Sequence, residues 1–295
     1  MDALTELESG LRVIRAPNPS PMTGPGTNTY LLGQREITII DPGPVSVPHL
    51  EAILDATRGA RIARILVTHS HLDHSALVPR LAEETGVPVI AFGDSAAGRP
   101  YPALAGLGGG EGRDEQFVPD YLLSDEETLQ VEGEGLTALW TPGHFGNHLA
   151  FLWNGVGFSG DLVMGWTTTL ISPPDGDVAQ FRSSCRRLAK WQPERLYSGH
   201  GDPIEDPAAR IEWLLDHRDE REAQILAALD EEPGSAHDLS GRIYTDIPPH
   251  MLPIAARNVL AHLLDLQRRG LIIAFDTLTA STKVRLRSIF PPNPS

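Results

Sequence analysis

Four side chains that can bind a metal ion occur within the six residues from His69 to His74, in the segment THSHLDHS. This segment follows a branched apolar run at 62–67 that predicts a buried strand, and it precedes a predicted helix. In an extended turn alternate side chains point the same way, so His69 and His71 can bind one ion together. Asp73 and His74 lie past the bend and face a second position. Neutral imidazole suits zinc, and a carboxylate beside it offsets part of the ion's charge.

Three further segments end a predicted strand with a glycine turn that carries a metal-binding side chain. They are TPGH with His144, SGD with Asp161 and SGH with His200. Glycine lets the backbone turn sharply, so a ligand at each strand end can project into a common mouth. The predicted sets are His69, His71 and His144 for one ion and Asp73, His74 and His200 for the other, with Asp161 between them. Two ions roughly 3.5–4 Å apart would share a bridging hydroxide, a geometry used for displacement at phosphoryl or carbonyl centres.

The predicted chemistry is hydrolysis at neutral pH. Zinc lowers the pKa of bound water to about 7, so hydroxide is available without a protein base. Asp73 is the predicted catalytic residue, because it can orient that hydroxide and later carry its proton to the leaving group. Candidate substrate-binding residues are Asn28, Thr29, His148 and Trp166, and for each of them a purely structural role is the alternative.

The elements that must position these ligands alternate along the first two hundred residues. Branched runs predict strands at 11–15, 28–32, 37–40, 62–67, 87–92, 135–141, 148–153, 156–159 and 195–198, and apolar spacing predicts helices at 47–57, 76–84 and 178–191. Helices outside β-rich layers predict an α/β layered domain. A glycine-rich loop is predicted at 96–121. The sequence leaves open whether this loop covers the mouth of the metal site or mediates self-association.

The pattern changes after Asp206. A long amphipathic helix at 211–229, helices at 236–243 and 253–269, and β-type runs at 271–274 and 284–286 follow in the order of a winged-helix module. We therefore expect two domains, residues 1–206 and 207–295. From Pro233 onward seven basic residues stand against four acidic ones, whereas the whole chain has 24 Lys and Arg against 39 Asp and Glu, a net charge of −15.

Cysteine content and hydropathy indicate which cellular compartment the protein fits. The lone Cys185 cannot form an internal disulfide, which fits a reducing compartment. No apolar run approaches the ~18 residues of a membrane-spanning helix, and the acidic start MDALTELESG does not fit a signal peptide. We expect a cytoplasmic protein with no membrane partner, and the sequence leaves its oligomeric state open.

At these residues the sequence resembles the metallo-β-lactamase superfamily, with HxHxDH at 69–74 followed by His144, Asp161 and His200 in that family's order. NPSPMTGPGTNTYLLG at 18–33, IIDPG at 39–43 and AARNVLAHLLDLQRRG at 255–270 are similar to its beta-lactamase-like protein 2 branch. The resemblance covers nearly the whole chain. It implies a four-layer αββα sandwich followed by a winged-helix-like domain, a di-zinc site and hydrolytic activity. The animal member of this branch is an endoribonuclease on single-stranded RNA, and fungal relatives are thioesterases on carrier-bound polyketides.

This sequence differs from other branches of the superfamily at the metal ligands or in the C-terminal unit, and these differences narrow the kind of enzyme that the resemblance implies. Antibiotic-degrading enzymes of one major branch hold Cys where Asp161 stands, which disfavours β-lactam hydrolysis. Flavo-diiron oxygen reductases carry Glu in place of His71, which favours zinc over a redox di-iron centre. Glyoxalase-type enzymes share all seven ligands, but their C-terminal unit differs from this one. The expected cofactor is therefore zinc, about two ions per chain, with iron or manganese as alternatives.

Three hypotheses about function follow. The first is hydrolysis of a small ester or thioester, expected to survive loss of the residues after Asp206 if the sandwich stays folded. The second is a single-stranded RNA endoribonuclease, in which the tail grips RNA, so truncation and rising salt would depress cleavage. The third is a metal-dependent regulator that binds nucleic acid or protein through the C-terminal domain. Charge runs are usually solvated or paired, so the basic tail supports the last two only weakly.

Overall fold

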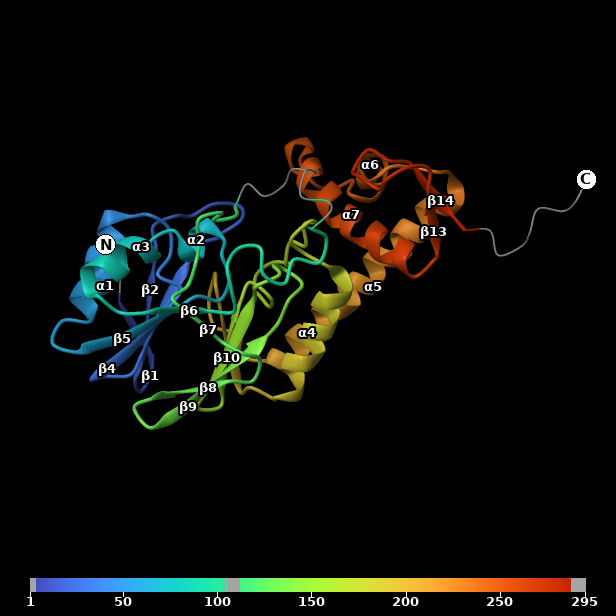
Figure 1. Ribbon diagram of the computed structural model, residues 1–295. Helices are drawn as coiled ribbons and strands as arrows, with labels where there is room; N and C mark the ends of the chain where they lie inside the picture. The colour runs from blue at the N-terminus through green and yellow to red at the C-terminus, as the bar shows by residue number, and fades with distance from the viewer. Residues whose placement is uncertain (1–3, 103, 105–111, 288–295) are drawn as a thin grey trace, which may run out of the picture.

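The computed structural model describes residues 4–287 except 103 and 105–111. Within these residues two sheets pack face to face and helices cover both outer faces, so the predicted four-layer αββα sandwich is confirmed. Figure 1 shows these layers and the smaller C-terminal module beside them. No helix among the described residues combines the length and the apolar character needed to span a bilayer.

The first sheet has seven strands in chain order, antiparallel from β1 to β4 and parallel from β4 to β7. The strands are β1 (Thr5–Glu8), β2 (Leu11–Arg15), β3 (Asn28–Leu32), β4 (Glu36–Ile40), β5 (Arg61–Leu66), β6 (Val89–Ala91) and β7 (Tyr121–Leu122). Every residue of β3 is buried, as expected for a central strand covered on both faces. The strands β4 to β7 run parallel, so their carboxyl ends lie on the same side of the sheet. The segment after β5 begins on that side.

The second sheet has five strands in the order β12-β11-β10-β9-β8. They are β8 (Thr128–Val131), β9 (Glu134–Trp140), β10 (Leu149–Trp153), β11 (Val156–Gly160) and β12 (Arg195–Ser198). β8 to β11 form an antiparallel meander, and β12 pairs with β11 in parallel. Their inner faces pack against the first sheet through a core that includes Leu32, Ile40, Phe151 and Phe158.

Helices close the outer face of the first sheet. They are α1 (Val47–Ala56) and α3 (Val78–Thr85), and the short α2 (Leu72–Ser75) stands at the sheet's edge. Ile53 of α1 and Leu81 of α3 are fully buried against the sheet. Ser46 caps α1 by accepting a hydrogen bond from the His49 N–H, and Gly86 ends α3 in a left-handed conformation.

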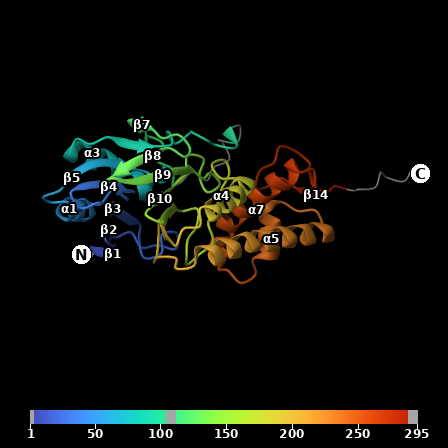
Figure 2. The ribbon, with the colours of Figure 1, turned by 90° about the horizontal axis from the view of Figure 1, so that it is seen from below.

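Three helices cover the outer face of the second sheet. They are α4 (Val178–Lys190), the first half of α5 (Pro207–Glu231) and part of α7 (Leu252–Arg268). Figure 2 shows α4, α5 and α7 side by side. Ile211, Leu214 and Ala261 belong to the same buried core as Leu139 and Phe181. Helices α5 and α7, which follow the predicted boundary at 206/207, therefore contribute residues to the core of the sandwich.

The rest of α5 forms the C-terminal module together with α6 (Ala236–Ile243), the 3-10 turn Pro249–Met251, α7, β13 (Ile272–Ala274) and β14 (Val284–Leu286). Three helices followed by a two-stranded hairpin agree with the predicted winged-helix order. Leu239, Leu263 and Val284 lie in the module's own core. Ser235 and Asp238 form a capping box that starts α6.

The glycine-rich segment 96–121 lies partly outside the described residues. The described residues near its two ends contact the sandwich and the C-terminal module. The Leu72 N–H donates to the Gly112 carbonyl over 2.7 Å, beside the metal-binding motif. The Tyr101 hydroxyl donates to Asp177, the residue that caps α4, while the Tyr101 ring packs against the core of the C-terminal module.

Candidate metal centre

Strand ends from both sheets meet at one edge of the sandwich and carry the predicted ligands. The segment from His69 to His74 follows β5 of the first sheet. His144 follows β9, Asp161 follows β11 and His200 follows β12 of the second sheet. The structure thus brings all seven predicted side chains to one place.

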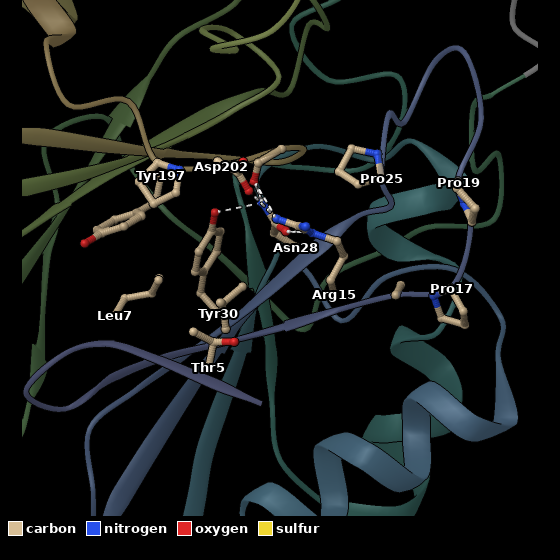
Figure 3. A pocket seen from close by; sticks show the side chains of 14 residues that line it. Thr5, Leu7, Arg15, Pro17, Pro19, Pro25, Asn28, Tyr30, Tyr197 and Asp202 are labelled. Carbon is tan, nitrogen blue, oxygen red and sulfur yellow. Dashed lines mark hydrogen bonds and ion pairs between the residues drawn. The ribbon is translucent and has the colours of Figure 1, made fainter. Parts of the chain in front are cut away.

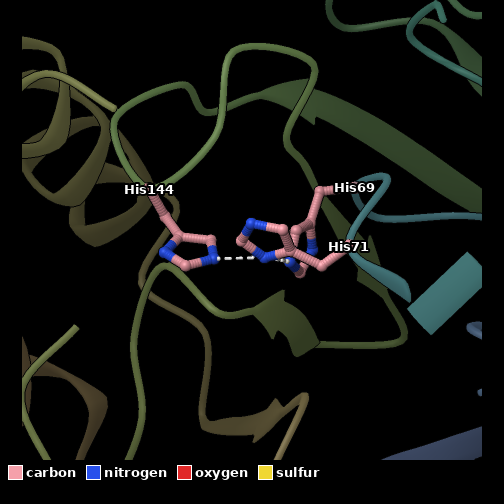
Figure 4. A group of neighbouring side chains, drawn as sticks. All are labelled: His69, His71 and His144. Carbon is pink, nitrogen blue, oxygen red and sulfur yellow. Dashed lines mark hydrogen bonds between the residues drawn. The ribbon is translucent and has the colours of Figure 1, made fainter. Parts of the chain in front are cut away.

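The first group consists of His69, His71 and His144, shown in Figure 4. Nε2 of His69 and Nε2 of His144 each lie 3.0 Å from Nδ1 of His71. Burial lowers the pKa of all three imidazoles, that of His71 to about 3. The rings are therefore neutral at pH 7, which is the form in which histidine binds a metal ion.

The second group consists of Asp73, His74 and His200. Oδ2 of Asp73 lies 3.2 Å from Nε2 of His200 and 3.5 Å from Nε2 of His74. Asp161 lies between the two groups, since its carboxylate oxygens are 3.5 Å from His74 Nε2, 3.4 Å from His200 Nε2 and 3.8 Å from His144 Nε2. The Asp161 carboxylate is therefore close enough to both groups to contribute a ligand to a metal ion at either of them.

Charge in the second group fits a cation. Burial alone would lower the pKa of His200, but Asp161 and Asp73 raise it to about 9. Burial likewise opposes ionisation of Asp73 and Asp161, yet the imidazoles of His74 and His200 keep the pKa of both carboxyls below the usual value. The carboxylates of Asp73 and Asp161 therefore place negative charge where a metal ion would bind.

Two buried polar atoms without a hydrogen bond support a fit between these residues and a metal ion. Nε2 of His74 and Oδ1 of Asp161 are buried and have no hydrogen-bond partner within the part of the chain that the structure describes. Such atoms are costly unless something binds them. Imidazole nitrogens and carboxylate oxygens are the donors that zinc takes outside thiolate sites.

Residues behind the ligands hold the rings in orientation. Oδ2 of Asp41 lies 2.9 Å from Nδ1 of His74, and the Leu170 carbonyl lies 2.7 Å from Nδ1 of His144. Asp41 also accepts hydrogen bonds from the backbone N–H and the hydroxyl of Thr68. Sequence reasoning missed Asp41 as a functional residue, although the IIDPG turn places it directly after a buried strand.

Glycine turns allow the ligands to approach one another. At Gly143, whose φ is +140°, a Cβ atom would lie 2.3 Å from the backbone of Phe181 in α4. At Gly199 a Cβ atom would lie 2.4 Å from Oδ1 of Asp161 and 2.6 Å from Cε1 of His74. The recurrence of glycine before each ligand therefore has a steric cause.

Asn28 and Thr29 are both buried in β3. The Asn28 amide donates to the Ser198 and Gly201 carbonyls and so holds the turn around His200. Asn28 lines a separate cavity of about 630 Å³, together with Arg15 and Tyr30 (Figure 3). The Thr29 hydroxyl donates to the Asp41 carbonyl over 2.7 Å. Both side chains are used within the fold, and their contact with substrate stays a prediction.

His148 and Trp166 take different places. His148 is fully buried, and its Nε2 accepts a hydrogen bond from the Asp161 N–H over 3.2 Å. Its Nδ1 lies 2.9 Å from the Thr141 hydroxyl, so His148 positions a ligand from behind. Trp166 is 43 % exposed and lies against the turn at Gly201.

A cavity of about 290 Å³ opens beside Asp161. Its walls come from the loop before β3, from the segment after Asp161 and from the C-terminal module. The lining residues are Pro21, Met22, Asp161, Met164, Thr167, Thr168, Leu170, Tyr244, Ile247, Met251, Ile254, Ala255 and Asn258. Sequence reasoning missed this cavity, because its walls are far apart in the chain.

Two family models match the chain. The model of the metallo-beta-lactamase superfamily matches residues 22–200, and that of the beta-lactamase associated winged helix domain matches residues 235–277. The chain therefore belongs to the metallo-beta-lactamase superfamily, and it is a hydrolase of that superfamily with a C-terminal winged-helix domain.

Individual relatives agree with this assignment. A beta-lactamase-like protein 2 homolog of Drosophila melanogaster is 34 % identical over 281 residues, which cover 91 % of each chain. An atrochrysone carboxyl ACP thioesterase of Aspergillus fumigatus is 32 % identical over 228 residues, covering 74 % of this chain and 65 % of the thioesterase. A metallo-beta-lactamase family protein of Thermus thermophilus superposes with a TM-score of 0.79 at 27 % identity, covering 96 % of this chain and all of the other.

Proposed function

We propose that the protein is a binuclear, zinc-dependent hydrolase of a small ester or thioester. The observation that carries the proposal is the two three-residue groups with Asp161 between them, 3.4–3.8 Å from ring nitrogens of His74, His200 and His144. Two buried polar atoms of this cluster have no hydrogen-bond partner among the described residues. His69, His71 and His144 would hold one ion, and Asp73, His74 and His200 the other. Bound zinc would supply Lewis-acid activation of water and of the substrate carbonyl.

Asp73 is the proposed proton carrier. Its side chain is 27 % exposed, against 10 % for Asp161, so substrate and water can reach it. Despite burial, the imidazoles of His74 and His200 hold the pKa of Asp73 below its usual value, and its carboxylate is therefore ionised at pH 7. An ionised carboxylate at this place accepts a proton from the attacking water and returns it to the leaving alkoxide or thiolate.

The cavity beside Asp161 favours an uncharged substrate over RNA. Among the described residues that line it, none is Lys, Arg or His, and most are apolar. A polyanion is bound mainly by neutralising its phosphates with such cations. The net charge of −15 adds repulsion to this local lack of positive charge.

Basic residues of the C-terminal module are used for internal pairing. Nη1 of Arg268 lies 3.2 Å from Oδ2 of Asp177, and Arg269 pairs with Glu222 of α5. Nη2 of Arg257 donates to the Pro173 carbonyl in the catalytic domain. These contacts support the interpretation of this part of the tail as a paired face.

The test compares substrate classes on one preparation of the full chain. A short S-acyl thioester, 4-nitrophenyl acetate and a labelled single-stranded RNA are given to chelator-stripped and zinc-reconstituted protein. We expect zinc to restore thioester or ester hydrolysis, and His71→Ala to lower kcat/KM by about 100-fold or more. His237→Ala, which changes an exposed histidine of the C-terminal module, is the matched control. RNA cleavage that depends on His71 and exceeds ester hydrolysis in kcat/KM would overturn the proposal.

A further inference from the structure

The cavity beside Asp161 is shared between the two domains. Asp161 lines it together with Met251, in the 3-10 turn before α7, and Ile254 of α7. Met22 and Leu170 close it from the catalytic domain. We propose that this cavity binds an uncharged, apolar substituent of the scissile carbonyl, so that the C-terminal module selects the substrate. The inference rests on the proposed ester or thioester hydrolysis.

The chemistry of the walls defines the ligand. The C-terminal module contributes Tyr244, Ile247, Met251 and Ile254, and among the described lining residues Asp161 alone carries a charge. Burying apolar groups there is favourable, whereas burying an unpaired charge is costly. Methionine side chains adapt to the shape of an aliphatic chain. At about 30 Å³ for a water-sized group, a cavity of about 290 Å³ holds a chain or ring of roughly ten heavy atoms.

The floor of the cavity is held in place from behind. Nε of Arg210 donates to the Met164 carbonyl over 2.7 Å, and its Nη2 donates to the Thr167 carbonyl over 2.6 Å. Arg218, itself buried, donates to the Thr169 carbonyl. These guanidinium groups stabilise the segment after Asp161 and bind its carbonyls rather than a ligand. A preformed apolar site discriminates by size better than a loop that must be ordered.

The C-terminal module also reaches the metal centre through this segment. Oδ1 of Asn258 in α7 accepts a hydrogen bond from the Ile171 N–H over 3.0 Å. The neighbouring Leu170 carbonyl bonds Nδ1 of His144 over 2.7 Å. One helix therefore forms a wall of the cavity and supports the segment that orients a predicted ligand, so the module is built into the site.

The experiment uses two series of thioesters on the zinc-loaded full chain. One series lengthens the acyl chain from acetyl to octanoyl with the thiol fixed, and the other lengthens the thiol with acetyl fixed. We expect kcat/KM to rise in one series by up to about fourfold for each buried methylene. Ile254→Trp, which fills the cavity, is expected to reduce the long-to-short ratio of kcat/KM to about one, whereas Leu271→Trp, outside the cavity in the same domain, keeps it.

Different results of these assays overturn the inference and the proposed function. A ratio that Ile254→Trp leaves at the wild-type value in both series would overturn the inference. Ile254→Ala enlarges the cavity and should move the best chain length upward, which keeps the test decisive if Ile254→Trp does not fold. If neither a thioester nor 4-nitrophenyl acetate is hydrolysed, the proposed function fails. Calorimetric binding of uncharged octanamide against acetamide then tests the cavity independently, and equal affinities, unchanged by Ile254→Trp, would overturn the inference.

Discussion

Asp41 holds His74 by a contact of 2.9 Å between Oδ2 and Nδ1, and both side chains are almost fully buried. The contact fixes which nitrogen of His74 carries a proton and leaves Nε2 facing the metal centre. Asp41 adopts a φ of +53°, a conformation that Asn tolerates, so Asp41→Asn removes the charge with little backbone strain.

Asp41→Asn is therefore expected to weaken zinc binding by about 10- to 100-fold while the protein stays folded. Competition with a chromophoric chelator measures the affinity. Asp202→Asn changes a carboxylate that is 89 % exposed and should bind zinc as the wild type does. Wild-type affinity in Asp41→Asn would show that the His74 contact does not support the metal site.

Gly199→Ala tests the packing between ligands. The new Cβ atom would approach Oδ1 of Asp161 to 2.4 Å and Cε1 of His74 to 2.6 Å, so these side chains must move apart. We expect the variant to fold and to lose most of its bound metal, measured by elemental analysis after gel filtration. Gly241→Ala has open space around its Cβ position and serves as the control. Full metal content in Gly199→Ala would contradict the observed packing.

His148→Leu tests the support behind Asp161. The substitution leaves the buried Asp161 N–H without the partner that the structure gives it, and the Thr141 hydroxyl keeps only a longer contact of 3.4 Å with the Leu139 carbonyl. We expect the free energy of unfolding of the metal-free protein to fall by about 1–3 kcal/mol, as measured by urea titration. His237→Leu, at an exposed histidine, should stay within about 0.5 kcal/mol of the wild type. An unchanged value for His148→Leu would refute its positioning role.

His262 predicts a pH dependence of stability away from the metal centre. Its ring is buried in α7, and neither nitrogen has a partner among the described residues. Burial lowers the pKa of His262 well below its usual value, and four cationic or titratable neighbours lower it further. They are Arg218, Arg182, Arg221 and His217.

The sign of this dependence follows from proton binding. Below about pH 6.5 the unfolded chain binds a proton at His262 that the folded protein does not, so stability falls as the pH falls. His262→Leu removes this loss and should be the more stable protein, by a margin that grows by about 1 kcal/mol between pH 7.5 and 5.5. Parallel urea-unfolding profiles of the two proteins across this range would contradict the prediction.

Two predicted strands, 11–15 and 28–32, have the bounds that the structure shows. Three apolar residues mark each of them, in LRVIR and in NTYLL. Strands β1 and β8, at sheet edges, were missed, since TELE and TLQV carry the polar residues of an exposed edge. The two-residue β7 is too short to give a periodic pattern.

The candidate ligands could be predicted because their chemistry is local. Four donors between His69 and His74, and a glycine directly before each of His144, Asp161 and His200, are visible in a short stretch of sequence. The partners of these ligands are not local. Asp41 lies 33 residues before His74, and nothing in its own turn indicates which ring it binds.

The cavity could not be predicted for the same physical reason. Ile254 lies on an amphipathic helix whose apolar spacing indicates a buried face but not the surface it packs on, and Met251 lies in the 3-10 turn before that helix. Tertiary packing alone brings both into one cavity with Asp161. The role of the C-terminal module in the site is therefore a property of the fold.

The most direct test of the central claim is the metal content of the purified full chain after reconstitution, measured by elemental analysis against protein concentration. We expect about two zinc ions per chain, falling to about one in His200→Ala, which removes one ligand from the second group. A chain that binds no divalent ion after reconstitution, or that keeps two in a variant lacking both His71 and His200, would contradict it.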